Sequence, residues 1–235
     1  MLVEDLTVPC WYTWRAYGHH GVPQVDDEAG SRYELLDPAA RAVSDRHWHR
    51  QAAAGVREPG HASFRAIVTE PLPEREDVAV RTLDDAIIYE LHVGGFTRDP
   101  SSGVRDPGTF AALIEKIPYL KELGITHVEL LPVMAFDEQD VPASAAANGL
   151  VNYWGHSTHS FYSPHPRYCV EPERAPQEFR ALIDAMHAAG IRVLLDVVFN
   201  HTAEAGLSGP VINFKVLANE VFYHVDPANG ERYLD

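Results

Sequence analysis

Apolar and polar positions after residue 86 alternate between strand-like and helix-like segments. Three short segments rich in apolar and β-branched residues predict strands: IIYELHV at 87–93, THVELLPV at 126–133 and IRVLLDVVF at 191–199. Apolar residues at helical spacing predict amphipathic helices at 110–120 and 179–186, with an interruption at Pro118 and a stop at Gly190. Because this βαβαβ order implies parallel strands joined by crossovers, the chain is predicted to be an α/β protein.

Two α/β architectures fit this order, an open Rossmann-like sheet and the opening of a (β/α)8 barrel. No G-x-G-x-x-G or G-x-x-x-x-G-K motif follows a predicted strand, and this argues against a nucleotide-binding fold. The barrel is therefore preferred.

The segment IRVLLDVVFNHT at 191–202 carries the strongest functional signal. Its continuous apolar run predicts a central strand covered on both faces, followed by Asp196, Asn200 and His201. In barrels and open parallel sheets, ligands bind at this carboxyl edge. The alternative is structural: an Asp that caps a turn, an Asn in a left-handed conformation and a His that packs locally.

A long connection at 135–176 contains the aromatic-rich stretch NYWGHSTHSFYSPHPRY. Its aromatic residues are candidates for stacking on the apolar face of a glucosyl unit: Tyr153, Trp154, Phe161, Tyr162 and Tyr168. The alternative is a satellite hydrophobic cluster that holds down a long loop.

The residues before the first predicted strand divide into two parts. Residues 1–70 contain the strand-like pieces WYTWRAY and ASFRAIV between long turn-rich stretches and are predicted to be a β region. Residues 71–84 combine two prolines with a charge run and are predicted to be an extended linker. Residues 85–235 then form the barrel segment.

Composition narrows the function. With 19 Lys and Arg against 34 Asp and Glu, the formal charge is −15, which disfavours nucleic acid and anionic membranes as partners. No apolar run approaches the roughly 20 residues that span a bilayer, and no signal-peptide pattern is present. Cys10 and Cys169 lie far apart without a ligand pattern, so neither a disulfide framework nor a zinc site is expected. A cytoplasmic protein is the simplest expectation.

Taken together, these motifs resemble the α-amylase superfamily of glycoside hydrolases, and within it the isoamylase and glycogen-debranching group. DVVFNHTAE is similar to the family's conserved region at the third barrel strand, IIYELHVGGFT to the first strand, and LGITHVELLPV to the second. NYWGHSTHSFYSP resembles the substrate loop. The resemblance implies a partial (β/α)8 TIM barrel, preceded in residues 1–70 by the remnant of a starch-binding β-sandwich.

The resemblance also implies roles for individual residues. His201 is expected to hydrogen-bond a hydroxyl of the glucosyl ring beside the scissile bond, and Asp196 to support the active-site floor and the catalytic arginine. Asn200 would organise the loop or, in calcium-dependent members, bind metal. Since the debranching group often lacks that calcium role, no metal or cofactor is expected. His156 stands where the family commonly has a sugar-stacking tyrosine, so the substrate preference stays open.

The activity implied is hydrolysis of α-1,6 branch linkages in glycogen or limit dextrin with retention of configuration. Retaining glycosidases need two carboxyl groups about 5 Å apart, and the family places both on later strands, beyond Asp235. The 235-residue chain is therefore expected to hold no catalytic residue and to be inactive alone. Three alternatives remain: an α-1,4-acting amylase or branching enzyme, a non-catalytic glucan-binding module, and an unrelated doubly wound protein.

Overall fold

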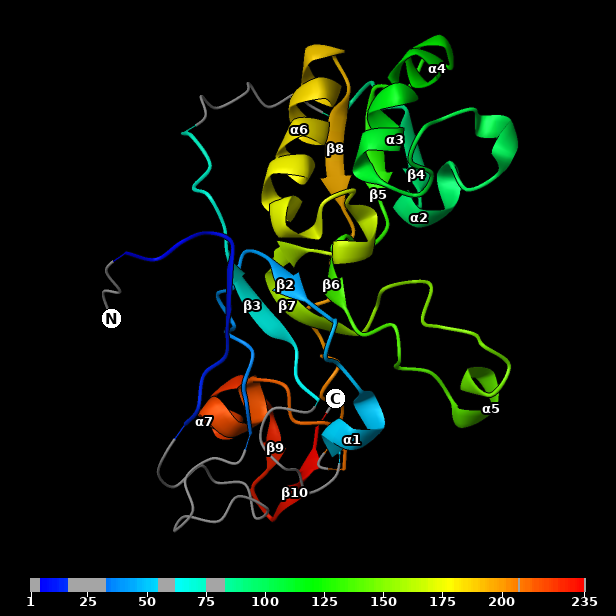
Figure 1. Ribbon diagram of the computed structural model, residues 1–235. Helices are drawn as coiled ribbons and strands as arrows, with labels where there is room; N and C mark the ends of the chain where they lie inside the picture. Colours follow the sequence, from blue (N-terminus) through cyan, green and yellow to red (C-terminus); the bar gives the residue numbers. More distant parts are fainter. Residues whose placement is uncertain (1–4, 17–32, 55–61, 75–82, 207, 235) are drawn as a thin grey trace.

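The computed structural model describes residues 5–16, 33–54, 62–74, 83–206 and 208–234. A three-stranded parallel sheet in the order β4-β5-β8 lies in the upper part of Figure 1. The strands are β4 (Ile88–Leu91), β5 (His127–Leu130) and β8 (Arg192–Leu195). In register, Glu90 lies beside Glu129, which lies beside Leu194. The predicted βαβαβ order and the parallel pairing are confirmed.

Helices cover one face of this sheet, where α3 (Phe110–Glu115) and α6 (Ala175–Ala188) pack together (Figure 1). Leu182 and Val128 are among the fully buried side chains of the shared core. The predicted helical interruption is present, because α3 ends before Lys116 and α4 (Ile117–Glu122) follows. The proline of α4 lies in its first turn, where a missing N–H costs nothing.

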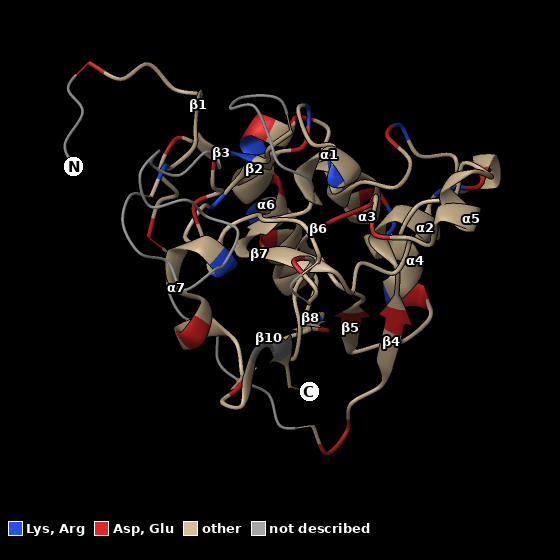
Figure 2. Ribbon diagram, turned by 90° about the horizontal axis from the view of Figure 1, so that it is seen from below, with Lys and Arg blue, Asp and Glu red and all other residues tan. Residues whose placement is uncertain are grey.

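The opposite face of the sheet is largely uncovered. Ile88 and Glu90 are exposed there, and Figure 2 shows acidic positions on the neighbouring strands β4 and β5. The prediction that residues 191–199 form a central strand buried on both faces is wrong. Strand β8 ends at Leu195, and β5 is its one partner among the described strands. The residues of β8 are half-buried or exposed. An apolar run shows that a strand can be buried, but it does not show which of its faces are covered. In the described part of the chain, helices cover only one face of β8.

The connection from β5 to α6 is a folded excursion rather than an open loop. Strand β6 (Met134–Phe136) pairs antiparallel with β7 (Thr158–Pro164), and α5 (Ala143–Ala146) lies near the tip of the segment between them (Figure 1). The remaining short helices before β8 are α2 (Val93–Phe96), η1 (Pro100–Ser102), η2 (Pro166–Tyr168) and η3 (Pro172–Arg174).

The N-terminal region forms a small antiparallel sheet in the order β1-β3-β2. Its elements are β1 (Cys10–Tyr12), β2 (Val43–Ser44), α1 (Arg50–Ala54) and β3 (Arg65–Val68). Trp48 and Phe64 pack in one buried cluster with Ala135, Ala203 and Ile212. The residues before the parallel sheet therefore share a core with residues that follow β5 and β8.

The described part of the predicted linker, residues 71–74 and 83–84, carries no helix or strand, and residues 75–82 lie outside the described ranges. After β8 the chain forms α7 (Phe214–Phe222) and the hairpin of β9 (Val225–Asp226) with β10 (Asn229–Tyr233). None of the helices among the described residues has the length and apolar character to cross a membrane.

Candidate substrate-binding site

The first part of the candidate site lies where β4 ends. His92 follows Leu91, and its ring stacks on Tyr153 with 4.0 Å between centroids and 16° between planes. The His92 Nε2 donates to the Tyr153 carbonyl oxygen at 2.7 Å, because a carbonyl can only accept. Burial lowers the pKa of His92, so the ring is neutral at pH 7. A neutral ring therefore anchors the aromatic loop, which we define as residues 137–157, to the carboxyl edge of the sheet.

Tyr153 and Trp154 present aromatic surface at this edge. Their side chains are 47% and 57% exposed, and their rings meet edge to face with 5.6 Å between centroids. His156 is exposed two residues later. Between them, Gly155 has φ +82°, and a Cβ there would lie 3.0 Å from the Phe136 ring. Only glycine fits this backbone position without strain, so the turn keeps both aromatic rings in place.

The second part of the site follows β8, and we call residues 196–206 the His201 segment. The Asp196 N–H donates to the Leu130 carbonyl at 2.9 Å, which extends the sheet by one residue. Asp196 is partly exposed, whereas Asn200 and His201 are exposed. None of the three side chains hydrogen-bonds to another residue in the described ranges. Asn200 and His201 line a hollow of about 650 Å³.

A buried carboxylate holds the backbone next to this hollow. Glu204 accepts hydrogen bonds from the N–H groups of Ile212 at 2.6 Å, Asn213 at 2.8 Å and Lys215 at 3.0 Å. It also accepts one from the Tyr223 hydroxyl at 2.7 Å. Four donors compensate the carboxylate for its loss of water, so the end of the His201 segment is fixed from behind.

Lys215 closes the same turn from the other side. Its Nζ donates to the carbonyl oxygens of Gly206 at 2.6 Å and Gly209 at 3.2 Å. Burial lowers the pKa of Lys215 to about 8, partly offset by the charge of Glu204. The Tyr223 hydroxyl lies 2.6 Å from the Thr202 Oγ1, beside His201. The turn after His201 is thus held by side-chain bonds to its backbone.

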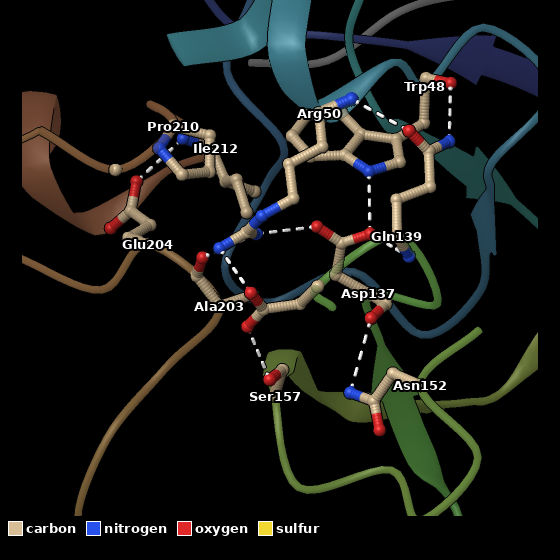
Figure 3. Close-up of polar contacts among 12 residues, drawn as sticks. Trp48, Arg50, Asp137, Gln139, Asn152, Ser157, Ala203, Glu204, Pro210 and Ile212 are labelled. Atoms are coloured by element: carbon tan, nitrogen blue, oxygen red, sulfur yellow. Dashed lines mark hydrogen bonds and ion pairs between the residues drawn. The ribbon is translucent and has the colours of Figure 1, made fainter. Parts of the chain in front are cut away.

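A third group of polar residues connects the two parts of the site, as Figure 3 shows. Asp137 is fully buried and accepts from the Trp48 Nε1 at 2.8 Å and from the Arg50 Nη1 at 2.7 Å. Burial raises the pKa of Asp137, against these hydrogen bonds, which lower it. Arg50 also contacts Asp140, at 2.6 Å, and donates to the Ala203 carbonyl at 2.9 Å.

The sequence-predicted residues therefore form two groups. Tyr153, Trp154 and His156 share the aromatic loop, while Asp196, Asn200 and His201 share the segment after β8. No ring contact or hydrogen bond joins the two groups among the described side chains. Both groups lie on segments that follow parallel strands, as predicted, and Arg50 contacts both segments.

Two aromatic residues named from the sequence do not fit a binding role at this site. Tyr168 is buried in the main core, where it packs against Phe110 and Phe136. Tyr162 is exposed but lines a different hollow with Phe179 and Arg180. An aromatic-rich stretch does not distinguish exposed rings from buried ones, because that depends on strand register.

Sequence reasoning missed His92, Arg50 and Asp137. His92 was counted within a strand, although its position directly after the strand end was a usable signal. Arg50 and Asp137 are 87 residues apart and belong to no spaced motif. No group of three or more His, Cys, Asp or Glu side chains suited to a metal ion occurs within the described ranges.

Comparison with known families gives a match to the alpha amylase catalytic domain over residues 76–211. Isoamylase 1 of Arabidopsis thaliana is 35% identical over 92% of this chain, which covers 29% of that relative. Isoamylase SU1 of Zea mays is 35% identical, again over 92% of this chain and 28% of the relative. The chain thus spans less than a third of these relatives, and its resemblance to the isoamylase group is confirmed.

Solved structures agree. The catalytic module of the glycogen-degrading pneumococcal virulence factor SpuA superposes with a TM-score of 0.67 at 29% identity, covering 88% of this chain and 30% of that one. A pullulanase from Paenibacillus barengoltzii gives a TM-score of 0.62 at 25% identity, covering 83% of this chain and 30% of that one. The fold is that of an α-amylase catalytic domain, a TIM-barrel family.

The expectation of a cytoplasmic protein is wrong by these comparisons. The isoamylases of Arabidopsis thaliana, Zea mays and Oryza sativa are all named chloroplastic. Low cysteine content indicates a reduced environment and does not separate one reduced compartment from another. The family match covers residues 76–211, and these include β4, β5 and β8 with the loops that follow them. The chain belongs to the α-amylase catalytic domain family.

Proposed function

We propose that this chain is part of a glycoside hydrolase that cleaves α-1,6 branch linkages in glycogen or a related α-glucan. The observation that carries the proposal is the exposed Tyr153–Trp154 pair, held on His92 directly after the first parallel strand. Aromatic faces stack on the apolar face of sugar rings. Family membership and the isoamylase relatives support the choice of an α-glucan.

Each candidate residue has a role in this proposal. Tyr153 and Trp154 form the stacking platform, and His156 extends it. His201 hydrogen-bonds a hydroxyl of the glucosyl ring beside the scissile bond, while Asp196 and Asn200 form the floor and shape the loop. Support comes from the exposure of Asn200 and His201 on the hollow of about 650 Å³. An exposed donor or acceptor can exchange water for a sugar hydroxyl at little cost.

The proposed reaction requires two carboxyl groups, and we assign neither of them to this chain. In a retaining reaction, one acid protonates the leaving oxygen, the other attacks the sugar carbon, and water then releases the covalent intermediate. We assign both carboxyl groups to positions outside these 235 residues. The isolated chain is accordingly proposed to bind glucan without turning it over.

The domain division is part of the same proposal. Residues 1–70 are a remnant of a starch-binding-like β-sandwich, 71–84 a linker, and 85–235 the first part of a (β/α)8 barrel. The antiparallel sheet β1-β3-β2 and the parallel sheet that begins at Ile88 support these boundaries. The uncovered face of the parallel sheet supports an incomplete barrel.

A second candidate function is a non-catalytic glucan-binding module, favoured by the presence of binding residues without assigned catalytic carboxyl groups. Native electrophoresis with and without glycogen in the gel tests binding, and release of reducing ends from limit dextrin tests turnover. We expect retarded migration and no turnover from this chain. Loss of retardation in Tyr153→Ala but not in Tyr162→Ala would support the site, since Tyr162 is exposed outside it. Unchanged migration of the wild type would contradict both functions.

If a longer polypeptide containing this sequence is obtained, the same dextrin assay separates the two functions. Release of linear chains from limit dextrin indicates α-1,6 cleavage. If the longer polypeptide binds glucan but releases no product, the result supports the non-catalytic binding module.

A further inference from the structure

We infer that Arg50 is a positioning residue that sets the distance between the aromatic loop and the His201 segment, and so determines glucan affinity. The inference rests on the proposed function of the site. Arg50 lies on α1, before the parallel sheet, in a segment to which neither the family comparison nor the predicted motifs assign a role.

The Arg50 guanidinium contacts both segments at once. Toward the aromatic loop, it donates to Asp137 at 2.7 Å and contacts Asp140 at 2.6 Å. Toward the His201 segment, the same Nη1 that contacts Asp137 donates to the Ala203 carbonyl at 2.9 Å. Ala203 is two residues from His201, and two residues of extended chain span about 7 Å. A displacement of the Ala203 carbonyl therefore also moves the His201 backbone.

The two aspartates bound by Arg50 also contact both ends of the YWGH motif, Asp137 through its backbone carbonyl and Asp140 through its carboxylate. The Asp137 carbonyl accepts from Asn152, and the Asn152 side chain accepts from the Gly155 N–H, both at 3.3 Å. The Ser157 hydroxyl donates to Asp140 at 2.5 Å. Asn152 precedes Tyr153, and Ser157 follows His156. The stacking residues therefore lie between two contacts to the aspartates that Arg50 binds, and the Asn152 N–H also donates to the Glu138 carbonyl at 2.8 Å.

The geometry requires arginine rather than positive charge alone. Guanidinium carries its five N–H donors on a planar, rigid fork, whereas an ammonium is a compact point charge. A lysine at position 50 would not span Asp137, Asp140 and the Ala203 carbonyl together. The Arg50 side chain is 17% exposed and that of Asp137 is fully buried, so water replaces these contacts poorly.

Loss of Arg50 is expected to lower both stability and affinity, because it leaves the fully buried Asp137 carboxylate without its cation. Other contacts still support the fold. Asp137 keeps its hydrogen bonds from the Trp48 Nε1 and the Gln139 N–H, at 2.8 and 2.9 Å. Trp48 itself stays stacked on Phe64. Ala203 keeps the bond from its N–H to the Thr158 carbonyl at 2.9 Å, and Asp140 keeps its bond from Ser157. The contacts that are lost are those of the guanidinium to the Ala203 carbonyl and to Asp140, which connect the two segments.

The test is calorimetric titration of maltotetraose into the full natural-length polypeptide and its variants Arg50→Lys and Arg50→Ala. Arg46→Ala is the matched control, because Arg46 lies in the same segment but forms an ion pair with Glu173 and has a side chain 64% exposed. We expect Kd to rise about tenfold in Arg50→Ala and several-fold in Arg50→Lys, at unchanged stoichiometry. Arg46→Ala should stay within about twofold of wild type.

The stoichiometry separates positioning from simple structural support. A residue that only stabilises the fold would lower the fraction of binding-competent molecules and leave Kd of that fraction unchanged. Added guanidinium at millimolar concentration should partly restore affinity in Arg50→Ala, and equimolar urea should not. If Arg50→Ala fails to fold, Arg50→Lys carries the test alone. Wild-type affinity in both variants would overturn the inference, whereas absence of binding by the wild type would overturn the proposed function.

Discussion

The two parts of the candidate site are held in different ways. The aromatic loop is held by side chains from outside it: Trp48 and Arg50 donate to the Asp137 carboxylate, and the His92 ring stacks on Tyr153. The end of the His201 segment is anchored by its own Glu204 side chain, which accepts from the N–H groups of Ile212 and Asn213. Asp196, Asn200 and His201 make no side-chain hydrogen bond to a described residue. The rings of the aromatic loop are thus fixed by contacts, whereas these three polar side chains after β8 have no hydrogen-bond partner among the described residues.

Because the two parts are held differently, we expect some substitutions in the site to lower mainly the stability of the protein and others mainly its affinity for glucan. The largest effect is expected for Asp137→Ala, because the substitution leaves the Arg50 charge without its buried partner. Removing one partner of such a pair costs about 3–5 kcal/mol. Chemical denaturation measures the loss. The control Glu171→Ala removes a carboxylate whose side chain is 62% exposed and should cost less than about 0.5 kcal/mol. Equal stability of the two variants would contradict a braced aromatic loop.

The second prediction concerns the loss of stability in acid, caused by a buried histidine next to the aromatic loop. His159, on β7, is buried against Phe64, and burial together with the nearby His165 lowers the pKa of His159 to about 3. Between this value and the usual 6.5, only the unfolded chain binds the proton. Stability is therefore highest above pH 6.5 and falls with decreasing pH, by at most about 1.4 kcal/mol per pH unit for one proton.

Denaturation of His159→Gln across pH 4–7 tests this sign. The variant is less stable near neutral pH, because it loses the ring stack, but its stability should fall less steeply with acid by about one proton. His47→Gln, at an exposed position, should keep the wild-type slope. An unchanged slope in His159→Gln would show that this ring does not carry the acid sensitivity.

The third prediction places affinity on the platform. Tyr153→Ala should raise Kd for maltotetraose about tenfold, because an exposed stacking surface is lost. Tyr153→Phe keeps the ring and should bind within about twofold of wild type. Tyr162→Ala is the control, since this residue is 70% exposed and lies in another hollow. A stronger effect of Tyr162→Ala than of Tyr153→Ala would relocate the site.

The smallest effect on stability is expected at His201. His201→Ala removes an exposed side chain without a described hydrogen bond, so unfolding should change by less than about 0.5 kcal/mol. Maltotetraose affinity should fall about fivefold, as for one lost hydrogen bond. Thermal unfolding and titration on the same preparation measure both. Destabilisation by more than 1 kcal/mol, as an order of magnitude for a structural contact, would favour the local-packing alternative.

Much of the fold could be predicted because its signals are local. The apolar runs and helical spacings after residue 86 predicted β4, β5 and β8 with their parallel order. The exposure of β8 could not be predicted, since it depends on which neighbours the strand has. The turn at Gly155 could be anticipated from the motif, while its contact with Phe136 needed the register of β6 and β7.

The sequence analysis named the exposed candidate residues of the site and missed the residues that support them. Tyr153, Trp154 and His201 belong to contiguous motifs that follow strands. Arg50 contacts Asp137, which lies 87 positions later in the chain, and Ala203, which lies 153 positions later. No periodicity or spacing in one sequence encodes such pairs, because the backbone path between them decides whether they meet.

The most direct test of the account is amide hydrogen exchange of the chain with and without saturating maltotetraose. Glucan bound across the two segments should slow exchange at residues 152–157 and 196–202. At a maltotetraose concentration that only just saturates the wild type, the protection of both segments should weaken together in Arg50→Ala. Protection confined to the surroundings of Tyr162 and Phe179, with both segments unchanged, would contradict the account.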